Sequence, residues 1–129
     1  WKTPLATSLD LHPLNPLASE HPMTLQLGML DDPKNLKQFP MSVDFETCGN
    51  LLIVGGGTGG KTIIVNNILF TLAQRLGPDA FHFYALDYSS RMLKLYNALP
   101  HCGGILQEED AASLDEFFKL INKTFAFTF

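Results

Sequence analysis

The feature that most constrains the fold of this chain is a glycine-rich segment that follows a short apolar run. Five of the ten glycines lie between Gly55 and Gly60. The four residues before them (51–54, Leu-Leu-Ile-Val) are typical of a strand covered on both faces. The two residues after them are Lys61 and Thr62, so that 55–62 fits the phosphate-binding pattern G-x-x-x-x-G-K-[ST] at every fixed position.

Each fixed position of this pattern has a physical purpose. Glycines allow the backbone to curl so that successive N–H groups point at phosphate oxygens, and a helix that begins near Lys61 adds the positive end of its dipole. The Lys61 ammonium would reach the β- and γ-phosphates, and the Thr62 hydroxyl would hold Mg²⁺. The candidate nucleotide-binding residues are therefore Gly55, Gly56, Gly57, Thr58, Gly59, Gly60, Lys61, Thr62 and Ile63.

The surrounding pattern supports a strand–loop–helix unit. A helix is predicted from Thr62 to Leu76, with a stripe formed by Ile64, Ile68, Leu72 and Leu76, and Gly77 and Pro78 follow it as stop signals. Before the loop, residues 24–30 and 41–45 alternate between polar and apolar, which predicts an antiparallel strand pair. Residues 1–22 carry four prolines and are interpreted as an extended arm or linker.

The second half of the chain repeats the alternation of strand and helix. Strands are expected at 80–86 and 103–106, and helices are expected from Ser89 or Ser90 toward Leu99 and across the apolar positions 114–121. The order predicts an α/β layered sheet that is largely parallel and is preceded by the antiparallel pair. The last residues, 123–129, alternate Phe with Thr or Ala, which would suit another strand.

Asp87 has three interpretations. An acid at the end of an apolar strand, downstream of a phosphate loop, is typical of a Mg²⁺-positioning residue. No second carboxylate follows it to polarise water, so Asp87 can equally line the site without touching metal or serve as a capping residue.

Composition excludes several classes of protein. The formal net charge is −4, which argues against a strongly basic nucleic-acid binder. No apolar run approaches the ~20 residues that span a bilayer. The two cysteines, Cys48 and Cys102, lack a metal-ligand spacing and are interpreted as buried thiols of a reducing, cytoplasmic compartment. Because the first residue is not Met, we expect the chain to be part of a longer one.

Beyond the phosphate loop, several segments resemble the FtsK/SpoIIIE-type motor ATPases. The segments are 83–90 (Phe-Tyr-Ala-Leu-Asp-Tyr-Ser-Ser) and 99–104 (Leu-Pro-His-Cys-Gly-Gly). The resemblance is strongest to the membrane-anchored type VII secretion ATPases EccC and EssC, which share the turn 28–33 (Gly-Met-Leu-Asp-Asp-Pro) and the opening Trp-x-x-Pro-Leu of residues 1–5. It implies a RecA-like P-loop fold, with the arm at 1–22, the N-terminal part of one ATPase domain at 23–122, and a tail at 123–129 outside the match.

The resemblance also implies a function. The chain would be an ATP-binding fragment of a membrane-associated motor that drives type VII protein secretion, using ATP and Mg²⁺ at the cytoplasmic face of the bacterial membrane. Its partners would be neighbouring ATPase domains in a hexamer and secreted protein substrates. In the family, the acid that matches Asp87 is not the Mg²⁺-positioning acid, which lies on a later strand. That acid and the arginine finger have no counterpart here, so the domain is expected to be incomplete and to hydrolyse little ATP.

Three alternatives stay open beside the motor. The first is a nucleotide-gated or degenerate ATPase domain that acts as a substrate-binding module. The second is an FtsK-like DNA-translocating motor, to which the net charge of −4 and the two arginines lend no support. The third is a small-molecule phosphotransferase.

Overall fold

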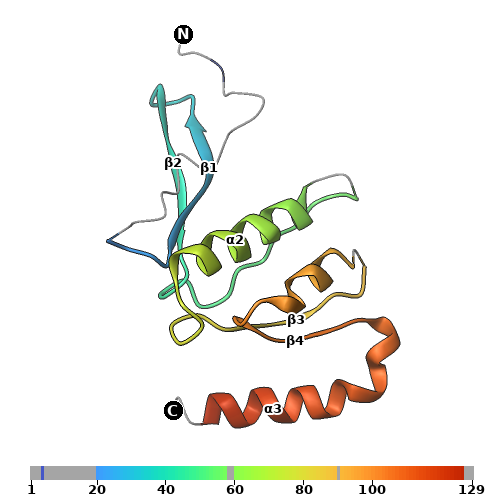
Figure 1. Ribbon diagram of the computed structural model, residues 1–129. Helices are drawn as coiled ribbons and strands as arrows, with labels where there is room; N and C mark the ends of the chain where they lie inside the picture. The colour runs from blue at the N-terminus through green and yellow to red at the C-terminus, as the bar shows by residue number, and fades with distance from the viewer. Residues whose placement is uncertain (1–3, 5–19, 58–59, 90, 127–129) are drawn as a thin grey trace. The chain divides into compact units, whose positions relative to one another are not determined.

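The computed structural model describes residue 4 and residues 20–57, 60–89 and 91–126, with side chains described up to residue 123. The chain divides into two compact units, Trp1–Gly77 and Pro78–Phe129. The arm predicted for 1–22 lies almost entirely outside the described residues. Figure 1 shows the elements of both units along the chain.

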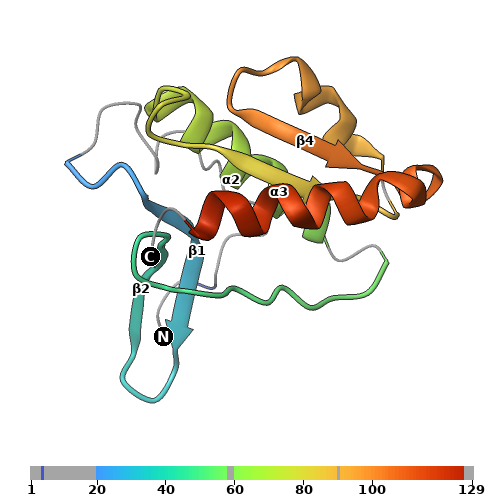
Figure 2. The same ribbon diagram turned by 90° about the horizontal axis from the view of Figure 1, so that it is seen from below.

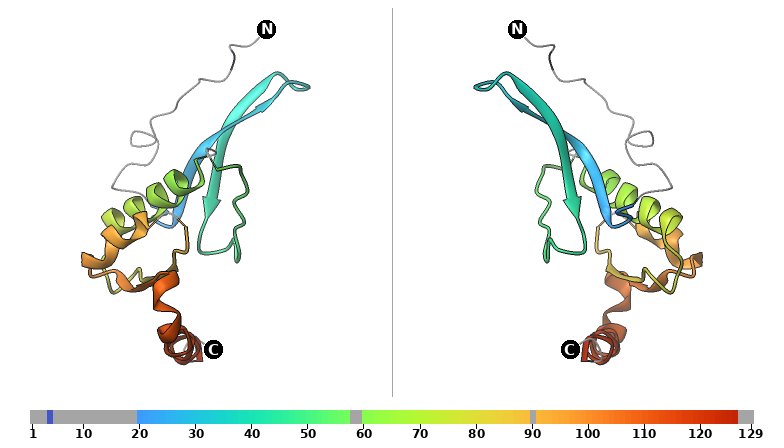
Figure 3. Two further views of the ribbon diagram at one scale, coloured as in Figure 1. Left: turned by 90° about the vertical axis from the view of Figure 1, so that its right-hand side faces the viewer. Right: turned by 90° about the vertical axis from the view of Figure 1, so that its left-hand side faces the viewer.

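The first unit contains the predicted antiparallel pair, and this expectation is confirmed. Strand β1 (Thr24–Asp32) pairs with strand β2 (Lys37–Asp44), with Leu30 opposite Phe39. The turn between them is closed by the Asp32 carboxylate, which accepts hydrogen bonds from the Asn35 side chain at 2.7 Å and from two backbone N–H groups. Figure 3 shows the two strands as a long, twisted ribbon.

Helix α2 (Lys61–Arg75) confirms the predicted helix within one residue at each end. Its buried side chains, Ile68 and Leu72, belong to the predicted apolar stripe. At its C-terminal end, Nη1 of Arg75 donates hydrogen bonds to the carbonyl oxygens of Pro22 and Thr24, at 3.1 and 2.9 Å. This side chain joins the end of the helix to the start of β1, about fifty residues earlier.

The prediction of a strand at residues 51–54 is wrong. The segment has no regular secondary structure, and the side chains of Leu52 and Val54 are 85% and 83% exposed. Figure 2 shows it as part of the extended connection from β2 to α2. A strand interior to a sheet needs hydrogen-bonded neighbours, and none of the described strands pairs with this segment.

The second unit is built on a parallel strand pair with helical segments on both faces. Strands β3 (Phe83–Leu86) and β4 (Cys102–Leu106) are connected by the 3₁₀ helix η1 (Met92–Ala98). The 3₁₀ segment η2 (Glu108–Ser113) and helix α3 (Leu114–Ala126) follow. Phe83 makes an edge contact with Tyr96 of η1, and the next residue, Tyr84, makes one with Phe117 of α3. Because successive strand residues point to opposite faces, η1 and α3 cover opposite faces of the pair.

Several local expectations for this unit need correction. Strand β3 begins at Phe83 rather than at residue 80, and the predicted helix toward Leu99 is a short 3₁₀ helix without a buried residue. Residues 123–126 continue α3 instead of forming a strand, because the helix period over 114–121 extends into them. Cys48 is exposed and Cys102 is half-buried, so neither is the fully buried thiol that was expected.

The fold class is α/β, with an antiparallel strand pair and a parallel one. Within the part of the chain that is described, no helix combines the length and apolar character needed to cross a bilayer.

Candidate phosphate-binding site

The predicted phosphate loop leads directly into the first turn of α2. Gly55, Gly56 and Gly57 are exposed, so their backbone groups are open to a ligand. Thr58 and Gly59 lie outside the described residues, so phosphate binding by these two residues stays a prediction. The loop's last residue, Gly60, is the N-cap of the helix.

Gly60 has the left-handed conformation, with φ of 77° and ψ of 11°. A residue with a Cβ adopts this conformation at a cost of about 1–2 kcal/mol, which explains the requirement for glycine here. The carbonyl of Gly60 accepts the first helical hydrogen bond, from the N–H of Ile64 at 3.1 Å. No side chain caps α2, and its first turn contains no acidic residue. The positive end of the helix dipole is therefore not neutralised by a carboxylate of the first turn.

The Lys61 side chain turns back over the loop. Its Nζ atom donates hydrogen bonds to the carbonyl oxygens of Gly55 at 2.5 Å and of Gly56 at 2.8 Å. The loop thus has two kinds of backbone group with different uses. The N–H groups of the exposed Gly55, Gly56 and Gly57 are those that the prediction assigns to phosphate oxygens, and the carbonyls of Gly55 and Gly56 hold the lysine ammonium. The sequence pattern identified these glycines for their N–H groups and gave no sign of the second use.

Thr62 and Ile63 follow in the first turn of the helix. Thr62 is half-buried, whereas the Ile63 side chain is 62% exposed. A hydroxyl in this turn is placed one residue after the ammonium that would neutralise phosphate charge, which suits a ligand of Mg²⁺ bound to the same phosphates. The residues present on this side of the loop therefore fit a nucleoside phosphate with its magnesium ion.

Asp87 belongs to the second unit, and its carboxylate is used by the backbone. The residue is 7% exposed. One carboxylate oxygen accepts a hydrogen bond from the N–H of Ser89 and the other from the N–H of Leu93, both at 3.3 Å. Its own N–H donates to the carbonyl of Leu106 on β4 at 2.9 Å. These bonds are those of a capping residue that fixes the connection from β3 to η1.

A metal role for Asp87 stays a prediction. Among the described residues, no three His, Cys, Asp or Glu side chains gather in a way that could hold a metal ion. A magnesium site of the kind predicted here needs only one carboxylate and a hydroxyl beside the phosphates, so it would not form such a group.

Comparison with known proteins places this site in a family context. The model of the FtsK/SpoIIIE family matches residues 16–122. The ESX-5 secretion system protein EccC5 of Mycobacterium marinum is 31% identical over 121 residues, which cover 85% of this chain and 9% of the relative. The type VII secretion system protein EssC of Staphylococcus aureus is 26% identical over 98 residues, or 76% of this chain and 7% of the relative. The chain therefore spans less than a tenth of the length of these two relatives.

Solved structures with the same fold come from the same group of proteins. EssC (ATPases 2 and 3) of Geobacillus thermodenitrificans superposes with a TM-score of 0.81 over 95% of this chain and 23% of that one, at 21% identity. EccC (ATPases 2 and 3) of Thermomonospora curvata, in complex with a signal sequence peptide, gives a TM-score of 0.63 over 74% of this chain and 17% of that one, at 25% identity.

Proposed function

This chain belongs to the FtsK/SpoIIIE family, and on that premise we propose that it is an ATP-binding part of a membrane-associated motor ATPase that drives type VII protein secretion. Residues 55–63 would bind the phosphates, and Thr62 would contribute to Mg²⁺ binding. The membrane association would place it at the cytoplasmic face, with neighbouring ATPase domains as partners. The similarity to EccC5 and EssC supports this assignment.

The observation that carries the nucleotide site is the arrangement around Lys61. Its ammonium is held by the Gly55 and Gly56 carbonyls at the mouth of the loop, and α2 begins at a left-handed glycine with no acidic residue in its first turn. A group with several negative oxygens would meet the ammonium and the positive helix end together.

Calorimetric titration of the 129-residue chain with ATP, in Mg²⁺ and in EDTA, tests the site. We expect saturable binding that is tighter with Mg²⁺ and at least tenfold weaker in Lys61→Ala, a loss of about 1.4 kcal/mol or more. The matched control is Lys34→Ala, an exposed lysine in the turn between β1 and β2. Absence of binding at millimolar ATP, or an equal loss in both variants, would contradict the proposal.

The substrate-binding module is a second candidate, favoured by one observation. The EccC ATPases 2 and 3 of Thermomonospora curvata have been solved with a signal sequence peptide bound. Introducing Lys61→Ala into the full-length parent separates the two functions. Loss of secretion with substrate binding intact supports the motor, whereas unchanged secretion and unchanged substrate binding support a module that does not depend on nucleotide.

A further inference from the structure

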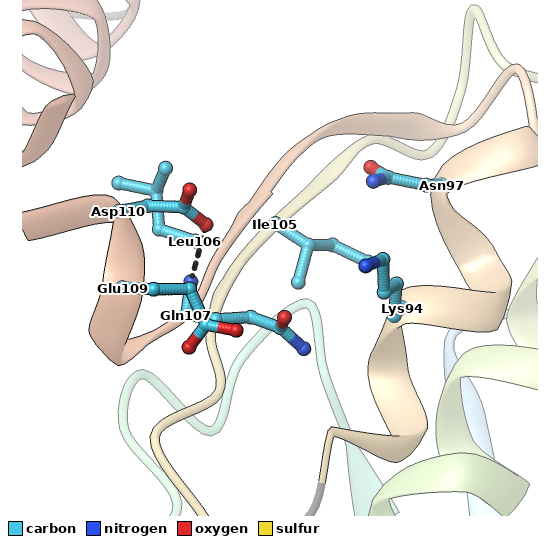
Figure 4. A pocket seen from close by; sticks show the side chains of 7 residues that line it. All are labelled: Lys94, Asn97, Ile105, Leu106, Gln107, Glu109 and Asp110. Carbon is cyan, nitrogen blue, oxygen red and sulfur yellow. Dashed lines mark hydrogen bonds between the residues drawn. The ribbon is translucent and has the colours of Figure 1, made fainter.

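A pocket of about 360 Å³ lies within the second unit, between η1 and the end of β4. Its volume is in the range of small-molecule sites. Figure 4 shows the Lys94 and Asn97 side chains on the η1 side and Gln107 on the opposite side, with Ile105 between them. Glu109 and Asp110 complete the polar part of the lining.

The buried wall of this pocket carries a side-chain donor that the protein does not use. Gln107 is only 6% exposed, and its Nε2 atom is buried without a hydrogen-bond partner among the described residues. Its backbone is firmly held, because its N–H donates to Oδ2 of Asp110 at 3.0 Å and its carbonyl accepts from the N–H of Asp110 at 2.9 Å. A buried N–H donor without a partner has lost its hydrogen bonds to water, and a ligand acceptor would replace them.

Some of the charged side chains in the lining already have a partner within the protein, and others do not. Glu109 forms an ion pair with Arg91 at 3.5 Å, and Asp110 accepts the Gln107 N–H. In the described part of the chain, no carboxylate lies within ion-pair distance of Lys94. The Lys94 ammonium and the buried amide nitrogen of Gln107 are therefore donors left to a ligand, beside the amide nitrogen of the exposed Asn97.

We propose that this pocket binds a carboxylate group, either of a small aliphatic acid or of an acidic peptide side chain, between Lys94 and Gln107. One carboxylate oxygen would accept from each of the two donors, and the ligand's methylene groups would lie against Ile105. The lining carries Lys94 against Glu109 and Asp110, and Arg91, outside the lining, offsets Glu109 through its ion pair. A phosphate dianion would need more donors and would bring a second negative charge toward the same two acids.

The test is a titration of the ¹⁵N-labelled 129-residue chain, followed by NMR at constant ionic strength. The probes are sodium butyrate and butyramide, which has the same shape but no charge. We expect saturable shifts for the Gln107 side-chain amide and for backbone amides of residues 94–110 with butyrate. We expect binding of butyramide to be at least tenfold weaker.

Substitutions of Lys94 and Gln107 test whether these two side chains bind the carboxylate. Lys94→Met should weaken butyrate binding at least tenfold, and Lys119→Met, an exposed lysine on α3, should leave it unchanged. Gln107→Met removes the buried amide nitrogen, together with the side-chain oxygen that caps η2, while keeping a long side chain, and it should lower affinity. Because Lys94 is exposed, its variant reports on binding even where the buried substitution disturbs folding.

A second pair of probes distinguishes the sources of the carboxylate. Acetyl-Ala-Glu-Ala-amide and its Gln counterpart present the same group on a peptide. Tighter binding of the Glu peptide than of butyrate supports a peptide ligand, and equal binding supports recognition of the carboxylate alone. Equal affinity for butyrate and butyramide, an unaffected Lys94→Met variant, or tighter binding of inorganic phosphate than of butyrate would overturn the proposal.

Discussion

The ammonium nitrogen of Lys61 lies 2.5 Å from the carbonyl oxygen of Gly55, six residues earlier in the chain. This hydrogen bond orders the lysine at the loop, so less side-chain entropy would be lost if a phosphate bound as proposed. Phosphate oxygens would then compete with the Gly55 and Gly56 carbonyls for the same ammonium protons.

The left-handed conformation of Gly60 should make this position sensitive to substitution. Gly60→Ala places a Cβ on a residue with φ of 77°, so we expect a loss of about 1–2 kcal/mol in the free energy of unfolding. Gly60→Asn should lose less, since Asn tolerates this conformation. Urea denaturation measures both. Gly56→Ala is the control, because a Cβ there meets no atom within 4 Å, and a loss as large as that of Gly60→Ala would refute the conformational reason.

Asp87→Asn distinguishes a structural role from a metal role. The variant weakens the hydrogen bonds to the Ser89 and Leu93 N–H groups, so we expect a loss of about 1–3 kcal/mol in unfolding free energy and no change in Mg²⁺-dependent ATP affinity. Urea melts and calorimetry give the two values. Asp79→Asn, at an exposed position, should change neither. Loss of the Mg²⁺ dependence at normal stability would instead favour the metal-positioning role.

Gly103 allows the Tyr84 ring to approach β4. A Cβ at Gly103 would overlap a ring carbon of Tyr84. We expect Gly103→Ala to destabilise the protein by about 1–3 kcal/mol, measured by thermal or urea unfolding. The neighbouring Gly104→Ala meets no atom within 4 Å and is the matched control. In a Tyr84→Ala background the cost of Gly103→Ala should largely disappear, and persistence of the full cost there would rule out the ring contact as its cause.

Arg75 should contribute to stability through the two carbonyl groups to which its side chain donates hydrogen bonds. Arg75→Met removes the donor to the Pro22 and Thr24 carbonyls, and we expect a loss of about 1–2 kcal/mol in unfolding free energy. Burial lowers the pKa of this guanidinium, which nevertheless remains protonated at neutral pH. Urea denaturation measures the loss. Gln74→Met, at the adjacent exposed position, is the control, and an equal loss in both variants would contradict a contribution from the two carbonyl hydrogen bonds.

The turn between β1 and β2 should give a measurable pH effect. The Asn35 side-chain hydrogen bond, together with backbone N–H groups, lowers the pKa of Asp32. A lowered folded-state pKa means that this carboxylate stabilises the folded protein above its unfolded pKa of about 3.9 and ceases to do so as pH falls through the folded value. In NMR titrations, Asn35→Ala should raise the pKa of Asp32, whereas Lys34→Ala should leave it nearly unchanged. An unshifted pKa in Asn35→Ala would show that the backbone bonds dominate.

The features that could be predicted from the sequence are those that depend on residues within a single turn, helix or strand. The loop pattern at 55–62, the stripe of α2 and the alternation in β1 and β2 depend on residues close together in the chain, and the α/β class follows from their order. The strand predicted at 51–54 failed for the opposite reason. Its apolar composition fits a strand, but strand formation depends on a neighbour that composition does not specify.

By itself, then, the sequence determined that a phosphate-binding pattern precedes a helix in an α/β protein of the FtsK/SpoIIIE family. The tertiary structure decided which partner each polar group has. The loop carbonyls bind the Lys61 ammonium and the turn before η1 binds the Asp87 carboxylate, whereas no described group binds the amide nitrogen of Gln107. The reason is physical. A residue type states which hydrogen bonds a side chain can make, but only the positions of other backbone segments determine which of them are made.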